Sequence, residues 1–352
     1  MSATRTAKAF LIALACATAL VGCGSIGPAV DPLTATVGSP VWPKPPEEPR
    51  VRYLHSVSGP ADWGITKSLL RRFIDALTSN ADEHLVRPTG VAVYGRVMYV
   101  ADPGARAVWI LDAEENRSIK VTDLDDIPLA APVAVAPAPA GGVFFADSVR
   151  KEVVLLSREG KPTGFAVREG LLQPVALAYD RSSGRLYVAD AAANQVFVYD
   201  ENGSRIGFAG KPGGGDGELN RPTHLALDRA GLLLVTDALN FRVQAFDLDQ
   251  KFAWKIGIHG DSSGELAAPK GVACDSEGRL ILVDALFDSI QFFDRDGTYL
   301  LTLGGRGEGP GQFWLPNGLF IDTQDRIFVA DAYNRRIQVL DAIPDAKEEP
   351  SK

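Results

Sequence analysis

The segment Phe328-Val-Ala-Asp331 is the last of six similar stretches in which a short apolar run ends in aspartate. The six final aspartates, spaced 43 to 47 residues apart, are Asp102, Asp147, Asp190, Asp237, Asp284 and Asp331. A proline lies fourteen to sixteen residues before each of them, at positions 88, 132, 174, 222, 269 and 316. The residues ten positions after them are Asp112, Ser157, Asp200, Asp247, Asp294 and Asp341. A repeat of about 40 to 50 residues indicates a propeller or a solenoid.

The repeated unit has the sequence pattern of β-strands. Its apolar positions alternate or form short continuous runs, and β-branched and aromatic residues predominate in them. The unit around Asp237 predicts four strands, at residues 225–228, 232–236, 243–246 and 252–257. Four antiparallel strands in each of six units predict an all-β protein, a six-bladed β-propeller. The units are expected near residues 86–130, 131–172, 173–220, 221–267, 268–314 and 315–341.

The two ends of the repeat region predict how the ring closes. The sixth unit ends at Asp341, before a charged tail at 342–352, and therefore lacks an outer strand. The segment Arg50-Val-Arg-Tyr-Leu-His-Ser-Val57 is a strand of suitable length, and we expect it to complete the last blade of a propeller spanning 50–341. Such pairing removes the exposed strand edges that promote aggregation.

Residues 65–78 predict one short helix between this closing strand and the first unit. The apolar residues of the segment, at 65, 69, 70, 73, 74 and 77, fall on one helical face. We expect this face to pack against the propeller. The alternative is a helix on a membrane surface, which Lys67, Arg71 and Arg72 would favour.

Several short patterns resemble the NHL-repeat family. They are the Pro-x-Gly starts, the Val-Ala-Asp endings and the run Asp-Ala-x-Asn-x-Arg-Ile-Gln-Val at 331–339. The resemblance covers roughly residues 86–341 and is sharpest in the fourth and sixth units. It implies a six-bladed propeller whose relatives include binding modules, some of them RNA-binding, and lyases or lactonases.

The N-terminus has the pattern of a secretory signal. Arg5 and Lys8 precede an apolar run from Ala9 to Val21 that is short for a membrane span. Leu20-Val-Gly-Cys23 follows, and it resembles the bacterial lipobox, which implies a signal peptide at 1–22 and lipidation of Cys23. Gly24 then implies the outer membrane, and the alternative is a plain secreted protein. Seven prolines predict that the rest of 23–49 is an extended tether.

The composition limits the function further. The chain has 352 residues, 46% of them hydrophobic, and a formal net charge of −8. An acidic protein repels phosphate, so we expect no nucleic-acid partner. The three cysteines provide no disulfide framework, because two lie within the first 23 residues. We expect the third, Cys274, to be a small buried strand residue.

The strand directions predict which loops share a face. The Pro-x-Gly starts, the loops after the six aspartates and the glycine-rich segments 211–221, 259–269 and 304–316 should lie together. Because Asp recurs in every unit, we assign the six aspartates to capping of their own turns. The segment 304–311 is similar to a phosphate-binding loop, but no helix follows it, so the nucleotide interpretation fails.

Positions at which the units differ predict a binding surface. Leu239, Leu286 and Tyr333 are apolar residues two positions after the aspartate, on loops expected at the surface. We predict that they form a docking surface for a protein or peptide, together with Phe241, Phe287, Lys270, Asn317, Arg221, His224 and Trp314. The alternative is that the apolar side chains turn inward and cover the ends of the blades.

An enzyme is the second interpretation of the same face. A metal-dependent lyase or lactonase would place its site at the mouth of the central channel, where His224 is the one histidine expected. The other histidines, His55, His84 and His259, form no close ligand pair with it. We therefore expect no cofactor, no metal and no catalytic residue. The first interpretation remains a membrane-anchored scaffold that binds an envelope protein or peptide, with its oligomeric state left open.

Overall fold

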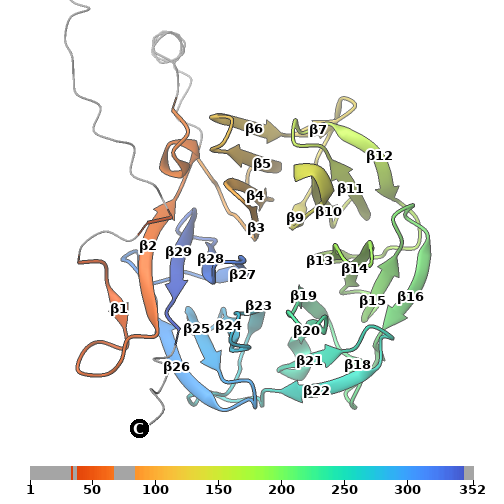
Figure 1. Ribbon diagram of the computed structural model, residues 1–352. Coiled ribbons are helices and arrows are strands. Elements are labelled where there is room, and N and C mark those ends of the chain that lie inside the picture. The colour runs from red at the N-terminus through yellow and green to blue at the C-terminus, as the bar shows by residue number, and fades with distance from the viewer. Residues whose placement is uncertain (1–32, 35–37, 67–83, 345–352) are drawn as a thin grey trace, which may run out of the picture. The chain divides into compact units, whose positions relative to one another are not determined.

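The computed structural model describes residues 33–34, 38–66 and 84–344, and this part of the chain is a six-bladed β-propeller (Figure 1). The predicted all-β fold and the number of blades are therefore confirmed. In blades 1 to 5 the strands follow one another in chain order from the central channel to the rim. Each inner strand begins at or just after the proline of the repeat, where a missing amide donor is tolerated.

The strands of the first three blades are β3 (Gly90–Tyr94), β4 (Val97–Asp102), β5 (Ala107–Asp112) and β6 (Arg117–Val121); β9 (Pro132–Pro137), β10 (Val143–Asp147), β11 (Glu152–Leu156) and β12 (Pro162–Val167); β13 (Pro174–Asp180), β14 (Arg185–Asp190), β15 (Gln195–Tyr199) and β16 (Arg205–Ala209). The strands of blades 4 and 5 are β19 (Pro222–Leu227), β20 (Leu233–Asp237), β21 (Arg242–Phe246) and β22 (Phe252–Ile256); β23 (Pro269–Cys274), β24 (Leu280–Asp284), β25 (Ser289–Phe293) and β26 (Tyr299–Gly304). Short elements between them are the pairs β7 (Asp123–Leu124) with β8 (Ile127–Pro128) and β17 (Lys211–Pro212) with β18 (Glu218–Leu219), and the 3-10 turns η1 (Pro60–Trp63), η2 (Pro139–Gly141) and η3 (Ala238–Asn240).

Blade 6 joins the two ends of the chain. Its inner strands are β27 (Pro316–Ile321), β28 (Arg326–Asp331) and β29 (Arg336–Ala342), and its outer strand is β2 (Val51–Val57). β2 runs antiparallel to β29, with a register from Val51 opposite Ala342 to Val57 opposite Ile337. The predicted closing strand is therefore confirmed, and no blade of the ring is left without an outer strand.

A fifth strand, β1 (Val41–Trp42), extends blade 6 beyond β2. These residues belong to the segment that the sequence predicts as a tether. The Arg50 amide donates a hydrogen bond to the Trp42 carbonyl at 2.7 Å, and the Trp42 ring lies against Gly311. Partial burial of this ring and pairing with β2 explain why the segment follows the blade here despite its prolines.

The predicted helix at 65–78 lies almost entirely outside the described residues. Only its first two residues are described, and Ile65 packs with Trp63 of η1 into the apolar cluster beside blade 1. The predicted signal peptide, Cys23 and most of the charged tail also lie outside the described part. Within that part, no helix has the length and apolar character that a membrane span requires.

The core consists of apolar layers between neighbouring blades. Between blades 1 and 2, for example, Tyr99 and Ile110 pack against Phe145 and Val154, and all four side chains are buried. The middle strands of each blade are almost completely buried, which explains their continuous apolar runs.

The strand directions give the ring two different ends. The loops between the second and third strands and the connections between blades lie at one end, which we call the loop face. The tight turns between the first and second and between the third and fourth strands lie at the other end, the turn face.

Candidate functional site

The six recurrent aspartates of the loop face are structural. All six side chains are fully buried. In blade 3, Asp190 accepts hydrogen bonds from the amides of Leu172 and Gln173 at 2.6 and 3.0 Å, just before the inner strand. It also accepts hydrogen bonds from the amides of Ala192 and Ala193, at 3.1 and 3.0 Å, within its own turn. The aspartates of blades 1, 2, 3 and 5 bind amides of their own turns, as predicted. In blades 4 and 6 the prediction is wrong, because Asp237 and Asp331 accept from the side chains of Asn240 and Asn334 instead. All six also bind an amide just before the inner strand.

In blades 4 and 6 an arginine five residues later completes this arrangement. Arg336 donates to Asp331 at 2.8 Å and to the carbonyls of Glu308, Gly309 and Gln312 at 2.6, 3.0 and 2.9 Å. Those carbonyls belong to the glycine-rich connection from blade 5. Arg242 in blade 4 binds Asp237 and the connection from blade 3 in the same way. The glycine-rich loops are therefore held by internal hydrogen bonds, which the sequence pattern alone did not predict.

The loops after the aspartates share one backbone conformation. The fourth residue after each aspartate has a positive φ between 48° and 56°, at Arg106, Lys151, Asn194, Phe241, Asp288 and Arg335. The second residue after the aspartate then lies at the tip of the loop. Its side chain is 52% exposed at Leu239, 65% at Leu286 and 47% at Tyr333. These side chains point outward, in contrast to the alternative that they cover the blade ends, whereas Phe241 and Phe287 are only partly exposed.

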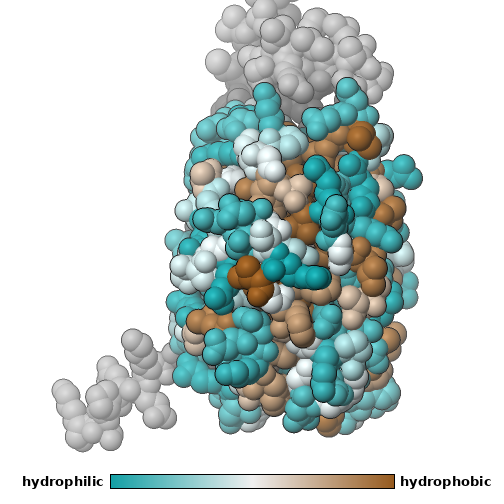
Figure 2. All heavy atoms as spheres, turned by 90° about the vertical axis from the view of Figure 1, so that its right-hand side faces the viewer, coloured by the Kyte–Doolittle hydropathy of each residue, from teal (hydrophilic) through white to brown (hydrophobic). Residues whose placement is uncertain are grey.

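Exposed apolar side chains are concentrated on the loop face. Nine of the thirteen large exposed apolar residues in the described part of the chain lie there: Val86, Ile127, Val149, Leu172, Leu239, Ile258, Leu286, Leu315 and Tyr333. The outer side of the ring at β12 and β16 has apolar areas broken up by hydrophilic ones (Figure 2). Ile206 and Phe208 are the exposed apolar side chains of β16.

Aromatic side chains extend the apolar surface at two places. The rings of Trp314 and Tyr333 are 5.5 Å apart, and the Arg306 guanidinium lies 5.0 Å from the Trp314 ring. The rings of Phe241 and His259 are 4.0 Å apart. The structure therefore brings Trp314 and Tyr333 together, as the predicted docking surface requires.

His224 occupies an exceptional position at the mouth of the channel. It is the second residue after the proline of its inner strand, where blades 5 and 6 have Gly271 and Gly318. A Cβ atom at Gly271 would lie 2.5 Å from the Leu319 amide nitrogen, so a side chain has no room there. Burial lowers the pKa of His224 to about 3, with a smaller effect of the Lys270 charge in the same direction. His224 is therefore neutral at physiological pH, and its buried Nδ1 atom has no hydrogen-bond partner among the described residues.

Lys270 lies beside His224, from the inner strand of the next blade. Burial lowers the pKa of Lys270, and the nearby charge of Arg221 lowers it further. Asn317, from blade 6, also lies beside His224. A hydrogen bond with the Asn317 side chain partly offsets the fall in the pKa of His224. Three of the residues that the sequence predicts at the mouth are thus brought together from blades 4, 5 and 6.

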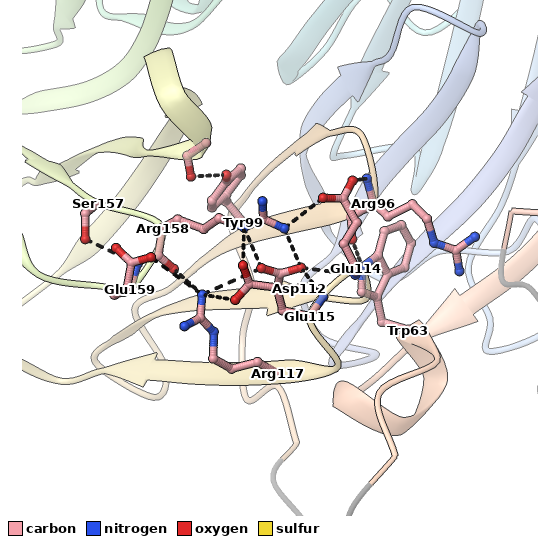
Figure 3. Close-up of polar contacts among 11 residues, drawn as sticks. Trp63, Arg96, Tyr99, Asp112, Glu114, Glu115, Arg117, Ser157, Arg158 and Glu159 are labelled. Atoms are coloured by element: carbon pink, nitrogen blue, oxygen red, sulfur yellow. Dashed lines mark hydrogen bonds and ion pairs between the residues drawn. The ribbon is translucent and has the colours of Figure 1, made fainter.

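The turn face carries a network of ion pairs between blades 1 and 2 (Figure 3). Arg158, from the turn after β11, donates hydrogen bonds to Asp112 at 2.6 and 2.8 Å and to Glu114 at 2.8 Å. Arg117 lies 3.7 Å from Asp112 and 3.9 Å from Glu159. Burial alone would raise the pKa of Asp112, but the hydrogen bonds from Arg158 and from backbone amides hold this pKa below its usual value. Opposite charges pair throughout this network, so it joins two blades.

The turn face also has a cleft of about 520 Å³ between blades 4 and 5. Trp254, Ile256 and Cys274 are among its lining residues. Burial raises the pKa of the Cys274 thiol to about 12, so the thiol stays protonated and is a poor nucleophile. The described residues contain no group of three or more His, Cys, Asp or Glu side chains that could hold a metal ion.

Comparisons with known proteins agree with the fold. A family described as "6-bladed beta-propeller" matches residues 177–262 and 269–342. NHL-repeat-containing protein 4 from Homo sapiens is 40% identical over 68 residues, which make up 19% of this chain and 54% of that protein. The chain thus matches about half the length of this curated relative. The chain is therefore a six-bladed propeller with a limited NHL-repeat relationship.

Solved structures resemble the chain in fold alone, because their sequence identities are low. Virginiamycin B lyase from Staphylococcus aureus has a TM-score of 0.55 and 14% identity, covering 73% of this chain and 96% of that one. A structural genomics protein of unknown function from Bacteroides thetaiotaomicron has a TM-score of 0.57 and 17% identity, covering 74% and 70%.

Proposed function

We propose that this six-bladed propeller is a binding protein whose loop face docks a peptide or an extended segment of an envelope protein. The observation that carries this proposal is the outward orientation of Leu239, Leu286 and Tyr333 at the loop tips of three consecutive blades. Exposing such side chains to water stabilises nothing within the propeller. A contiguous apolar surface with a polar rim is typical of a protein-interaction site.

The apolar surface over blades 4 to 6 can contribute part of the binding free energy. Complete burial of one Leu or Tyr side chain contributes about 1.5 to 3 kcal/mol, and about half of each of these three side chains is still available to a partner. Trp314 lies against Tyr333 and widens the surface, and the Arg306 guanidinium covers part of the Trp314 ring. Rigid blades present these side chains without the entropic cost of ordering a mobile loop.

The test compares two triple variants of equal apolar loss. One replaces Leu239, Leu286 and Tyr333 by serine, and the control replaces Ile206, Phe208 and Leu248, which are similarly exposed but lie off the loop face. Peptides selected against the wild-type protein from a displayed random library should bind the first variant at least about tenfold more weakly. The control should bind them as the wild type does. Equal binding by both triple variants would refute the proposed docking surface.

The alternative, a metal-dependent lyase or lactonase, predicts a different result. It requires stoichiometric zinc or calcium in the purified protein, lost on substitution of His224 by alanine. The binding proposal requires that peptide affinity is unchanged by a chelator. Metal analysis and a chelator titration on the same sample therefore distinguish the two.

The proposed place of action is the cell envelope. The support is the sequence pattern that ends at Cys23, which predicts a lipid anchor on this sulfur and, with Gly24, the outer membrane. A mass spectrum of the mature protein should show fatty acids on residue 23, and Cys23→Ser should release the protein from the membrane fraction. A mature polypeptide that begins elsewhere or has no acyl chain would contradict the anchor.

A further inference from the structure

The residues at the mouth of the channel divide it into two unlike halves. They are the first residues after the six prolines, and blades 1 to 3 contribute Thr89, Val133 and Val175. Blades 4 to 6 contribute Thr223, Lys270 and Asn317. One half of the mouth therefore has two valines, and the other half is polar with one cation.

The polar half carries positive charge that the described residues do not neutralise. No carboxylate in residues 33–34, 38–66 and 84–344 forms an ion pair with Lys270 or Arg221, although the whole chain has a net charge of −8. Of the charged groups nearby, only Arg221 affects Lys270, and it does so by repulsion. Two neighbouring cations, one of them half-buried, destabilise the folded protein unless an anion lies between them.

The backbone holds Arg221 beside this mouth. Arg221 has a left-handed φ of 57° directly before Pro222, and its amide donates to Asn194 Oδ1 of blade 3 at 2.6 Å. Such a conformation costs free energy for a residue other than glycine, and it is held here from the neighbouring blade. Leu315 has the same conformation, with a φ of 48°, in blade 6. The backbone therefore does not require an arginine, and the charge at 221 needs another explanation.

Two hydrogen-bonding atoms at the same place have no partner. His224 Nδ1 and Thr223 Oγ1 are buried, and no described residue pairs with either. Leaving such an atom buried and unpaired costs about 1 to 3 kcal/mol. A ligand oxygen that accepts from Thr223 and lies near Lys270 would remove this cost at Thr223 and would offset the charge repulsion.

We infer that the mouth of the channel binds a carboxylate attached to an apolar group, such as the free C-terminus of a peptide whose last residue is apolar. Lys270 and Arg221 provide the opposite charge, and Thr223 and Asn317 provide hydrogen-bond donors. Val133 and Val175, which pack partly against the apolar clusters between blades, belong to the other half of the mouth. This inference identifies the chemical group at one end of the docked segment. It rests on the proposed function only for where the ligand comes from.

The test uses two small probes of nearly the same shape, 4-methylpentanoate and its neutral amide. Titration of the purified protein, followed by NMR, should show that the carboxylate binds at least about tenfold more tightly, the factor expected for one charge-assisted hydrogen bond. Lys270→Met should reduce this preference, because only Arg221 then provides the opposite charge. It should leave the melting temperature unchanged or higher, because it removes a desolvated cation. Lys151→Met, on the same face but in an exposed loop, is the matched control and should keep the preference.

Three results would overturn the inference. They are equal binding of the carboxylate and the amide, an equal loss of preference in the two lysine variants, and tighter binding of inorganic phosphate than of 4-methylpentanoate. The triple serine variant of the docking surface separates this inference from the proposed function. It should lose the selected peptides and still bind 4-methylpentanoate, because the mouth is intact.

Discussion

Blades 4 and 6 are joined to the preceding blades by an arginine of the repeat pattern on the loop face, whereas blades 1 and 2 share an ion-pair network on the turn face and one arginine, Arg150, on the loop face. In blades 4 and 6, Arg242 and Arg336 hold the glycine-rich connections through carbonyl hydrogen bonds. In blade 2 the equivalent residue is Glu152, and Arg150 donates instead to the carbonyls of Ile127 and Pro128 in the connection from blade 1, at 3.2 Å each. On the turn face Arg158 also joins blades 1 and 2 through Asp112 (Figure 3).

The difference explains why the repeat pattern is clear in some units and weak in others. The recurrent Asn, Arg and Gln of the fourth and sixth units are needed only where a long connection crosses the loop face. A blade forms without them, since its strands and buried aspartate suffice. The strength of a repeat pattern therefore reports how neighbouring blades are tied together rather than whether a blade is present.

The largest effect is expected at Arg336. Arg336→Met removes four hydrogen bonds and leaves Asp331 buried with less compensation, so the free energy of unfolding should fall by about 3 to 5 kcal/mol. Urea denaturation measures this loss. Arg335→Met, one residue away with no side-chain partner among the described residues, should cost less than about 0.5 kcal/mol. Similar losses in the two variants would contradict the tie that we describe for blade 6.

Breaking the tie between blades 1 and 2 should cost less. Arg158→Met leaves Asp112 with its backbone amides and with Arg117 nearby, so we expect a loss of about 2 to 3 kcal/mol. Peptide binding on the loop face should not change, because the network lies at the other end of the ring. A loss of peptide affinity in a folded Arg158→Met protein would show that the two faces are coupled.

The ion pair of Arg158 and Asp112 predicts that the free energy of unfolding depends on pH. The pKa of Asp112 is lower in the folded protein than the value of about 3.9 in an unfolded chain. Its contribution to stability is therefore complete above that value and is lost as the pH falls through the folded pKa. Denaturation curves at several pH values should show that wild type and Arg158→Met differ most near neutral pH and converge in acid. A constant difference down to the acid range would argue against this role of Asp112.

The smallest expected effect is a gain in the free energy of unfolding, from a substitution in blade 5. Its connection is already held by Gln291, which donates to the Glu265 carbonyl at 2.8 Å, but Ser289 stands where blades 4 and 6 have arginine. The Ser289 hydroxyl is buried without a partner. Ser289→Arg should reach the connection and raise the free energy of unfolding by about 1 kcal/mol. Ala107→Arg in blade 1, whose preceding segment is not glycine-rich, is the control and should destabilise the protein. A gain in stability there too would mean that the glycine-rich connection is irrelevant.

The sequence predicts the elements whose spacing repeats. Prolines and aspartates at fixed intervals give six blades, and the missing outer strand of the last unit leads to β2. It does not predict β1, because two residues such as Val41 and Trp42 among prolines carry no strand pattern. Their position depends on a surface near Gly311 that only the folded ring provides.

The sequence predicts only part of the candidate site, because its other features also depend on the folded ring. Register alone places Leu239, Leu286 and Tyr333 at loop tips, and the structure shows them exposed. Register also brings His224 to the mouth of the channel, but its burial depends on neighbours from two other blades. The absence of a carboxylate near Lys270 in the described residues is likewise a property of the assembled ring. Such features become visible only when distant segments are placed together.

The pairing of β2 with β29 has a consequence for how a cell makes this protein. All the strands of blades 1 to 5 lie between β2 and β29 in the chain, so blade 6 cannot form until they have been translated. Contacts between such distant segments form slowly, and an open ring exposes strand edges in the meantime. A chain that ends before β29 therefore stays accessible to proteases. Cellular quality control can distinguish it from the closed propeller by its exposed strand edges alone.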